Sequence, residues 1–397
     1  MTKGEQVWSE HEFRGVDLGD KRLDARLQRI AGELAALPEA PINQASEDWA
    51  ATKAAYRFFQ NDHVTSAAIL KPHVERTIQR MCGEKIILAV QDSSSFNFTE
   101  HTKARGLGPI GDSRCDNQGL IMHNTLGLTT NGLPIGLLTN KIWAREGYKD
   151  QTGRKYKPIE EKESHRWIEA LQQTCKLVPT TTRIVTICDR ECDIYEFFLA
   201  VNDCKSDFVI RASWDRRLHL EEFGQLWEQL EAQQCAGNYK VSITSNGKRT
   251  ARIAQVEVRF TQVELRPPQR KGYKLPTVRL YAVYVREPNP PENAEPIEWM
   301  LLTNIAIKSF DDASEKISWY CYRWQIEIFH KILKSGCTVE DCRLETAERL
   351  CRYITLMCIV AWRIFWIMYM KRTDPNASAT KILTQHELHT LSTIEQR

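Results

Sequence analysis

Two short apolar runs, each leading into an aspartate, set the strongest limit on how this chain can fold. The first reads KIILAVQDSSSF and contains Asp92, and the second reads RIVTICDRECDIYEFF and contains Asp189. Short runs rich in Val and Ile are typical of buried strands. An Asp at the end of a strand is most often a turn or cap residue, so each one alone is weak evidence. Their order among the other expected elements carries more weight.

The amino-acid sequence around these two runs predicts a mixed α/β core. A hairpin is expected where Asn131 and Gly132 separate two apolar runs. A helix is expected over 159–177, strands at FVIRAS and WMLLTN, and a last helix near Asp311 and Asp312, either of which can cap it. The order is strand with Asp, hairpin, helix, strand with Asp, helix, strand, helix. It predicts a ribonuclease-H-like (retroviral-integrase-like) catalytic core of the α/β class.

The same patterns predict the organisation of the chain. Residues 1–80 have helical periodicity with a basic edge, which indicates an N-terminal helical domain. The core is expected over 81–372, with a β-rich insertion at 214–298 that has a turn at Asn246 and Gly247. Residues 373–397 are expected to form only a short C-terminal remnant.

The last helix of the predicted core carries an unusual set of polar residues. The segment WYCYRWQIEIFHKILKSG contains Tyr320, Arg323, Glu327 and Lys334, which share one stripe at about 100° per residue, and Lys331 falls on the same stripe. Charged residues are seldom buried without partners. The simplest alternative is an ion pair between Arg323 and Glu327, worth about 0.2–0.5 kcal/mol.

Three carboxylates from separate elements predict a metal site. Asp92, Asp189 and Glu327 offer the hard oxygen ligands that Mg²⁺ prefers, with open positions for water and phosphate. Such an ion suits in-line displacement at phosphorus. The spacings Cys188/Cys192 and Cys337/Cys342 lack the paired short knuckles of a structural zinc site.

At this point the chain resembles the DDE transposases of bacterial insertion sequences, specifically the insertion-sequence-four group that includes the transposon-five transposase. The matching segments are VDLGDKR, AAYRFF, AVQDSS, GLGPIG, ICDRECDIYEF, FVIRAS, EWMLLT and the Tyr-x2-Arg-x3-Glu-x6-Lys signature. The resemblance implies that Asp92, Asp189 and Glu327 form the catalytic, metal-binding triad. The implied activity is metal-dependent cut-and-paste DNA transposition: strand cleavage at transposon ends, hairpin formation and strand transfer to target DNA. Mg²⁺ is the implied cofactor, with Mn²⁺ able to replace it.

The resemblance also implies which residues contact DNA. Tyr320, Arg323, Lys334 and Arg211 are expected to hold phosphates near the cut. Lys331 is expected to join them because it falls on the same stripe, and not because the family signature includes it. Trp299 is expected to receive a base that flips out during hairpin formation.

Recognition of double-stranded transposon ends is assigned to the N-terminal domain. There the expected contacts are Arg22, Arg26 and Arg57, and the segment RPPQRKGYK at 266–274 is expected to add contacts to the DNA backbone. For any single cation of these helices, an ordinary solvated helix face is an equally good interpretation.

Composition sets weaker limits. The net charge of +3 neither demands nor excludes a polyanionic partner. The absence of CxxC pairs and of a secretory signal favours reduced thiols in a cytoplasmic protein without a membrane partner. The resemblance to transposases further implies that it is nucleoid-associated in a bacterial cell. The long apolar run from Leu350 contains Arg352 and Arg363, and a buried core helix is favoured over a membrane span.

Two other functions stay open. The family pairs two protomers on two DNA ends through a C-terminal helical domain, and only 373–397 are left here to supply it. A homodimer is expected from the family, but a C-terminally shortened copy that binds DNA and is transposition-deficient or inhibitory is an alternative. A cellular ribonuclease-H-like nuclease is a third interpretation, disfavoured by the Tyr, Arg and Lys stripe and by Trp299.

Overall fold

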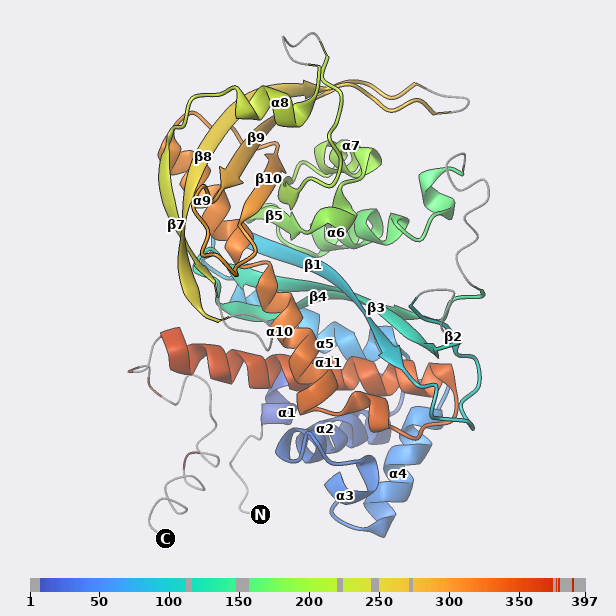
Figure 1. The fold of residues 1–397 in the computed structure, drawn as a ribbon. Helices are drawn as coiled ribbons and strands as arrows, with labels where there is room; N and C mark the ends of the chain where they lie inside the picture. Colours follow the sequence, from blue (N-terminus) through green and yellow to red (C-terminus); the bar gives the residue numbers. More distant parts are fainter. Residues whose placement is uncertain are drawn as a thin grey trace. The chain divides into compact units, whose positions relative to one another are not determined.

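The computed structural model falls into two compact units built from interleaved segments (Figure 1). It describes residues 8–111, 116–147, 157–219, 224–243, 250–270 and 274–373, with the single positions 376, 378 and 388. The first unit comprises Met1–Glu84, Ser93–Asp150 and Gln325–Arg397, and the second comprises Lys85–Asp92 and Gln151–Trp324. The predicted C-terminal remnant lies almost wholly outside the described residues.

The first unit begins with five helices, which confirms the helical prediction for the start of the chain. These are α1 (Trp8–Glu12), α2 (Lys21–Ala36), α3 (Ile42–Ala45), α4 (Trp49–Gln60) and α5 (Ser66–Arg80). The side chains of Asp20, Asp48 and Thr65 cap α2, α4 and α5 by accepting from backbone N–H groups.

A β-hairpin forms the centre of the first unit and confirms the predicted turn at Asn131 and Gly132. Its strands are β3 (Gln118–Thr129) and β4 (Pro134–Trp143), and the short β2 (Gly108–Pro109) also pairs with β3. Gly132 has φ of 81°, a value that glycine adopts without strain. Helix α5 packs against β4, and at Gly136 an added Cβ would lie 1.9 Å from the Thr77 hydroxyl oxygen.

The long helix α11 (Ala347–Thr373) is long and apolar enough to span a membrane by length and composition alone. It packs against β4 and α5, and 72% of its most apolar window is buried. The prediction of a buried core helix is therefore confirmed. Three short elements precede α11: α10 (Trp324–Lys331), the π-helical turn η4 (Ile332–Gly336) and η5 (Val339–Asp341).

The second unit is built on a mixed sheet with strand order β1-β5-β6-β10-β9-β8-β7. β1 runs parallel to β5, and β5 runs parallel to β6, whereas the later strands pair in antiparallel fashion. The strands are β1 (Ile86–Asn97), which extends into the first unit, β5 (Arg183–Cys188), β6 (Asp207–Arg211), β7 (Gly237–Ile243), β8 (Arg252–Leu265), β9 (Val278–Arg286) and β10 (Glu298–Thr303). The helices are η2 (Ile159–Glu161), α6 (His165–Leu177), η3 (Arg190–Cys192), α7 (Tyr195–Asp203), α8 (Leu226–Glu231) and α9 (Phe310–Cys321).

The predicted insertion is β-rich, as expected, because β7, β8 and β9 all fall within it and extend the sheet beyond β10. It also contains the short helix α8. The expected turn at Asn246 and Gly247 lies outside the described residues, as do 271–273 of the basic segment at 266–274.

Two predictions for the last helix of the core are wrong. The cap of α9 is Ser309, with Asp312 completing a capping box at the third helical position. The single continuous helix is also absent: α9 ends at Cys321, and Arg323 donates its backbone N–H to Tyr320 in a tight turn before α10 begins. A π-helical turn follows at η4, so the expected stripe at 100° per residue does not exist along this segment.

Candidate active site

Asp92 lies within β1, which continues to Asn97 and so does not end at the aspartate as expected, and Asp189 directly follows the neighbouring parallel strand β5. The pairing of β1 with β5 runs from Ile86 and Arg183 to Val90 and Ile187, and each aspartate follows the last pair by two residues. If the register of β1 with β5 is continued by two residues, the backbones of Asp92 and Asp189 lie side by side, about 5 Å apart. Parallel pairing therefore brings together two carboxylates that are far apart in sequence.

Each aspartate already has a partner. The guanidinium of Arg323 lies 3.6 Å from the carboxylate of Asp92, and both side chains are 17% exposed. Asp189 accepts a 2.9 Å hydrogen bond from the backbone N–H of Glu191 and so caps η3. The Glu191 side chain pairs with Arg166 at 2.6 Å, which directs it to another partner.

An aromatic pair and an arginine lie in the same unit. The rings of Trp299, at the start of β10, and Tyr320, near the end of α9, meet edge to face with centroids 5.3 Å apart. Burial raises the pKa of Tyr320 to about 12, so its hydroxyl stays protonated and able to donate. Arg211, at the end of β6, donates to the backbone carbonyl of Glu298 at 2.8 Å.

Positive charge is concentrated around these groups. Burial lowers the pKa of Arg211, and the nearby charges of Arg190 and Arg323 act in the same direction, whereas Tyr320 opposes them. Arginines that repel one another gain from binding an anion, because the anion relieves their repulsion. Two carboxylates beside three guanidinium groups suit a phosphodiester held next to a cation.

The donor set of the two aspartates fits a hard divalent cation. Within the part of the chain that the structure describes, no group of three or more His, Cys, Asp or Glu side chains is arranged to hold a metal ion. Two carboxylates nevertheless match Mg²⁺, which binds one or two carboxylates and completes its shell with water and phosphate oxygens. The predicted third ligand, Glu327, belongs to the first unit and stays a prediction.

Glu327 lies on a helix that a buried polar chain anchors. His330, one turn after Glu327 on α10, is 6% exposed and lies 3.0 Å from the Asn124 side-chain oxygen on β3. Asn124 donates to Asn140 on β4 at 2.9 Å, and Asn140 donates to Thr355 on α11. Four elements of the first unit are thus joined by side-chain hydrogen bonds that fix α10.

The two lysines predicted beside Glu327 are also in the first unit. Lys331 is exposed at the end of α10, and Lys334 lies in η4 with its ammonium 5.7 Å from the Phe96 ring centroid. The structure thus brings Asp92, Asp189, Arg211, Trp299, Tyr320 and Arg323 into the second unit. It leaves Glu327, Lys331 and Lys334 on a separate unit.

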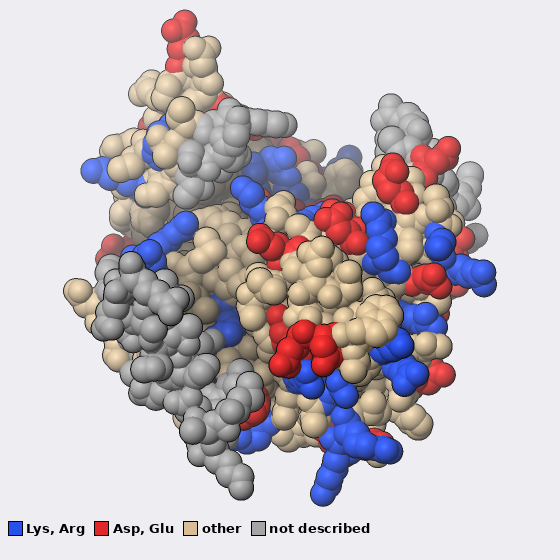
Figure 2. All heavy atoms as spheres, turned by 90° about the horizontal axis from the view of Figure 1, so that it is seen from below, with Lys and Arg blue, Asp and Glu red and all other residues tan. Residues whose placement is uncertain are grey.

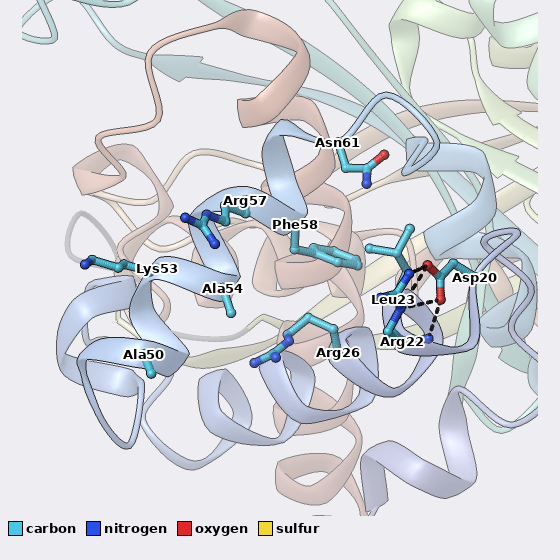
Figure 3. A pocket seen from close by; sticks show the side chains of 10 residues that line it. All are labelled: Asp20, Arg22, Leu23, Arg26, Ala50, Lys53, Ala54, Arg57, Phe58 and Asn61. Atoms are coloured by element: carbon cyan, nitrogen blue, oxygen red, sulfur yellow. Dashed lines mark hydrogen bonds and ion pairs between the residues drawn. The ribbon is translucent and has the colours of Figure 1, made fainter.

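The predicted DNA contacts of the first helices surround a pocket of about 410 Å³ between α2 and α4 (Figure 3). Arg26, Lys53 and Arg57 point to one side of it, whereas Arg22 turns toward Asp20 and pairs with it at 2.9 Å. Lys and Arg elsewhere on the face in Figure 2 are interspersed with Asp and Glu. The pocket is therefore a local concentration of positive charge.

Models of known protein families match both the N-terminal helices and the region that contains the candidate active site. Residues 5–64 match a family model described as transposase DNA-binding, and residues 161–363 match one described as transposase DDE domain. The second match alone spans more than half of the chain. The chain belongs to the DDE transposases. This transposase is thus an enzyme that cleaves and transfers DNA strands, and its mixed sheet is consistent with the ribonuclease-H-like α/β core of that domain.

Sequence reasoning missed several groups of the transposase. Lys53 was expected in a helix but not as part of a pocket, although its spacing of four from Trp49 and Arg57 places all three on one face of α4. The Asn124 and His330 pair had no sequence signal, because its members are far apart in the chain. Arg190 directly follows Asp189 and was visible only as part of a family string.

Proposed function

We propose that the transposase carries out magnesium-dependent cut-and-paste transposition as a member of the insertion-sequence-four group. The observation that supports this most is the pair Asp92 and Asp189, level on neighbouring strands beside Arg323, Arg211 and the Trp299–Tyr320 pair. A plain nuclease needs the carboxylates but gains nothing from a partly exposed tryptophan beside them.

Asp92, Asp189 and Glu327 would hold the metal ion. When bound, Mg²⁺ supplies a polarised phosphate and an activated attacking oxygen for in-line displacement. The same site then serves water attack, hairpin formation by the freed 3′-hydroxyl, and strand transfer. Mn²⁺, with similar oxygen preferences, would replace Mg²⁺.

The surrounding residues would bind and orient the DNA strand. In the free protein Arg323 neutralises Asp92, and a scissile phosphate is a competing anion for the same guanidinium. Arg211 and the protonated Tyr320 hydroxyl would donate to the same phosphate. Lys331 and Lys334 would hold neighbouring phosphates as point charges, and Trp299 would stack on the flipped base.

End recognition would fall to the N-terminal helices. Arg26, Lys53 and Arg57 line one pocket and would grip the backbone of double-stranded DNA, with Arg22 at its rim. A homodimer on paired ends follows from the family's need to cut two ends together. The domain limits that we propose are 1–80 for this region and 81–372 for the core, in a protein acting at the nucleoid.

The decisive experiment uses a duplex that carries the DNA sequences on either side of the coding region, where the proposed function places the transposon ends. With Mg²⁺ the wild type should nick and form hairpins, and Asp189→Asn and Glu327→Gln should bind the duplex equally well but not cut it. A wild type that binds these ends tightly without cutting would instead support a DNA-binding, transposition-deficient protein.

A further inference from the structure

Trp214 is a large apolar side chain exposed at the edge of the sheet that holds Asp189. It is 64% exposed and follows the end of β6 by three residues. β5 and β6 run parallel, with Cys188 level with Ile210. The segment after β6 therefore leaves the same edge at which Asp189 follows β5.

A buried carboxylate fixes the backbone that carries Trp214. Asp193, whose side chain is fully buried, accepts from the backbone N–H groups of Ser213 at 2.8 Å and Trp214 at 3.0 Å. Its other oxygen accepts from the Arg216 guanidinium at 2.9 Å. Asp193 itself is only four residues after Asp189, so it ties this loop to the loop that follows the active-site strand.

A second set of bonds holds the far side of the same loop. Asp215 accepts from the backbone N–H of Trp227 at 3.0 Å, and the Arg216 carbonyl accepts from Leu226 at 3.0 Å. The Arg217 carbonyl accepts from Arg266 at 2.9 Å. Consecutive residues from 213 to 217 are thus tied to their surroundings, while the indole between them is left in solvent.

This arrangement presents a rigid aromatic face. A loop that only connected two elements would not need a buried carboxylate to hold consecutive N–H groups. Fixing an aromatic side chain in advance lowers the entropy lost when a ligand stacks on it. Exposed Arg190, beside Asp189, and Arg211, at the end of β6, add the positive charge that a nucleic-acid strand needs.

We propose that Trp214 stacks on an unpaired nucleobase of a DNA strand next to the cut. This rests on the proposed function, because hairpin formation requires bases next to the cut to leave the duplex. Trp214 is distinct from Trp299, whose ring packs against Tyr320 within the site. Stacking tolerates any base, so the contact adds affinity without reading sequence.

The test compares two DNA probes of arbitrary sequence: a blunt duplex and the same duplex with an unpaired thymidine tail. Full-length wild type should bind the tailed probe more tightly by fluorescence anisotropy. Trp214→Leu should weaken binding to the tailed probe about fivefold to a hundredfold, the range for removal of one stacked aromatic, and leave the blunt probe unchanged. Trp214→Phe should restore most of the difference.

Trp49→Leu is the matched control, since Trp49 is 68% exposed but lies on α4 in the other unit. Its ratio of tailed to blunt affinity should equal that of the wild type. Equal affinity of Trp214→Leu and wild type for both probes overturns the proposal, and so does an equal loss on both probes. Because neither probe carries transposon ends, a wild type that fails to cut its ends leaves this result intact.

Discussion

At the scale of single residues, the proposed site is a set of groups that have partners within the protein and that bound DNA would also engage. Arg323 shows this most directly, because its guanidinium lies near a carboxylate that a metal ion would occupy and near the place a phosphate would take. The sequence offered an ion pair of Arg323 with Glu327 as the simplest alternative, and in the structure the Arg323 guanidinium also lies 3.6 Å from the Asp92 carboxylate. Asp92 is on β1, far from Arg323 in sequence, so local spacing could not have indicated this partner.

Trp299 allows a sharp prediction at this scale. Trp299→Ala should leave the first nick largely intact and slow hairpin formation about fivefold to a hundredfold, since one stacked base is lost. Trp299→Phe should retain most activity because an aromatic face remains. The measurement is the ratio of nicked to hairpin product over time, and an equal loss of both products would contradict a base platform.

At the scale of elements, the break between α9 and α10 matters most. The tight turn at Arg323 and the π-helical turn at η4 interrupt the regular α-helix between Tyr320 and Lys334. The two side chains are therefore not on one helical stripe. Such turns depend on tertiary packing that overrides a strongly helical local sequence. Periodicity predicted the helical character of the segment and could not place the breaks.

The buried chain from His330 to Asn140 predicts a positioning effect. His330→Leu removes the bond to Asn124 that helps to fix α10, the helix that carries the proposed metal ligand Glu327. Under the proposed function it should weaken the apparent Mg²⁺ affinity for cleavage about tenfold to a hundredfold, the range for loss of a group that orients a metal ligand. His330→Gln keeps an N–H donor of similar reach and should recover most of the loss.

The readout is the Mg²⁺ concentration needed for half-maximal cleavage, with DNA binding and thermal midpoint as controls. Asn124→Leu should have the same effect, and the double variant should be no worse than either single one. Additive losses in the double variant would show that the two side chains act separately.

The close packing of β4 against α5 at Gly136 gives a second prediction at the scale of elements. Gly136 has φ of 150°, and a Cβ there would lie 1.9 Å from the Thr77 hydroxyl oxygen, so Gly136→Ala should lower the free energy of unfolding by about 1–3 kcal/mol or more. Gly147→Ala, with open space around its Cα, should change it little. Urea unfolding measures both, and similar values for the two variants would refute the close approach.

At the scale of the whole molecule, a buried ionic network joins the first helices to the rest of their unit. Glu12 on α1 is 1% exposed, accepts from the Nδ1–H of His73 at 2.6 Å, and pairs with the Arg80 guanidinium at 3.0 Å. His73 accepts the Leu137 backbone N–H on β4 through Nε2, so its imidazole is neutral. Arg80 also stacks on Trp362 of α11.

Removing the central carboxylate should therefore affect the entire unit. Glu12→Gln leaves Arg80 without its ionic partner and should cost about 3 kcal/mol of unfolding free energy. Arg29→Gln removes exposed pairs with Glu33 and Glu47 and should cost less than about 1 kcal/mol. Urea unfolding at neutral pH measures the unfolding free energy of both variants. An equal loss in the two would show that the buried network is no stronger than an exposed ion pair.

The same network predicts loss of stability in acid. Burial alone would raise the pKa of Glu12, but His73 and Arg80 outweigh it and lower that pKa to about 2, while burial lowers the pKa of His73. The unfolded chain therefore binds more protons than the folded chain, first at His73 below its ordinary value of 6.5 and then at Glu12 between 4.5 and about 2. Unfolding free energy should fall as pH drops through both ranges, and this slope should be smaller in a Glu12→Gln, His73→Leu variant.

The sequence by itself determined the local elements and the family. The apolar strands that lead into Asp92 and Asp189, the Asn131 and Gly132 turn, the helices of the first eighty residues and the buried α11 all follow from short-range patterns, since periodicity and turn residues act within a few positions. Only the tertiary structure decided the break before α10, the pairing of Arg323 with Asp92, the chain from His330 to Thr355 and the rigid loop under Trp214. Each of these depends on contacts between segments distant in sequence, where packing and the burial of polar groups outweigh local preference.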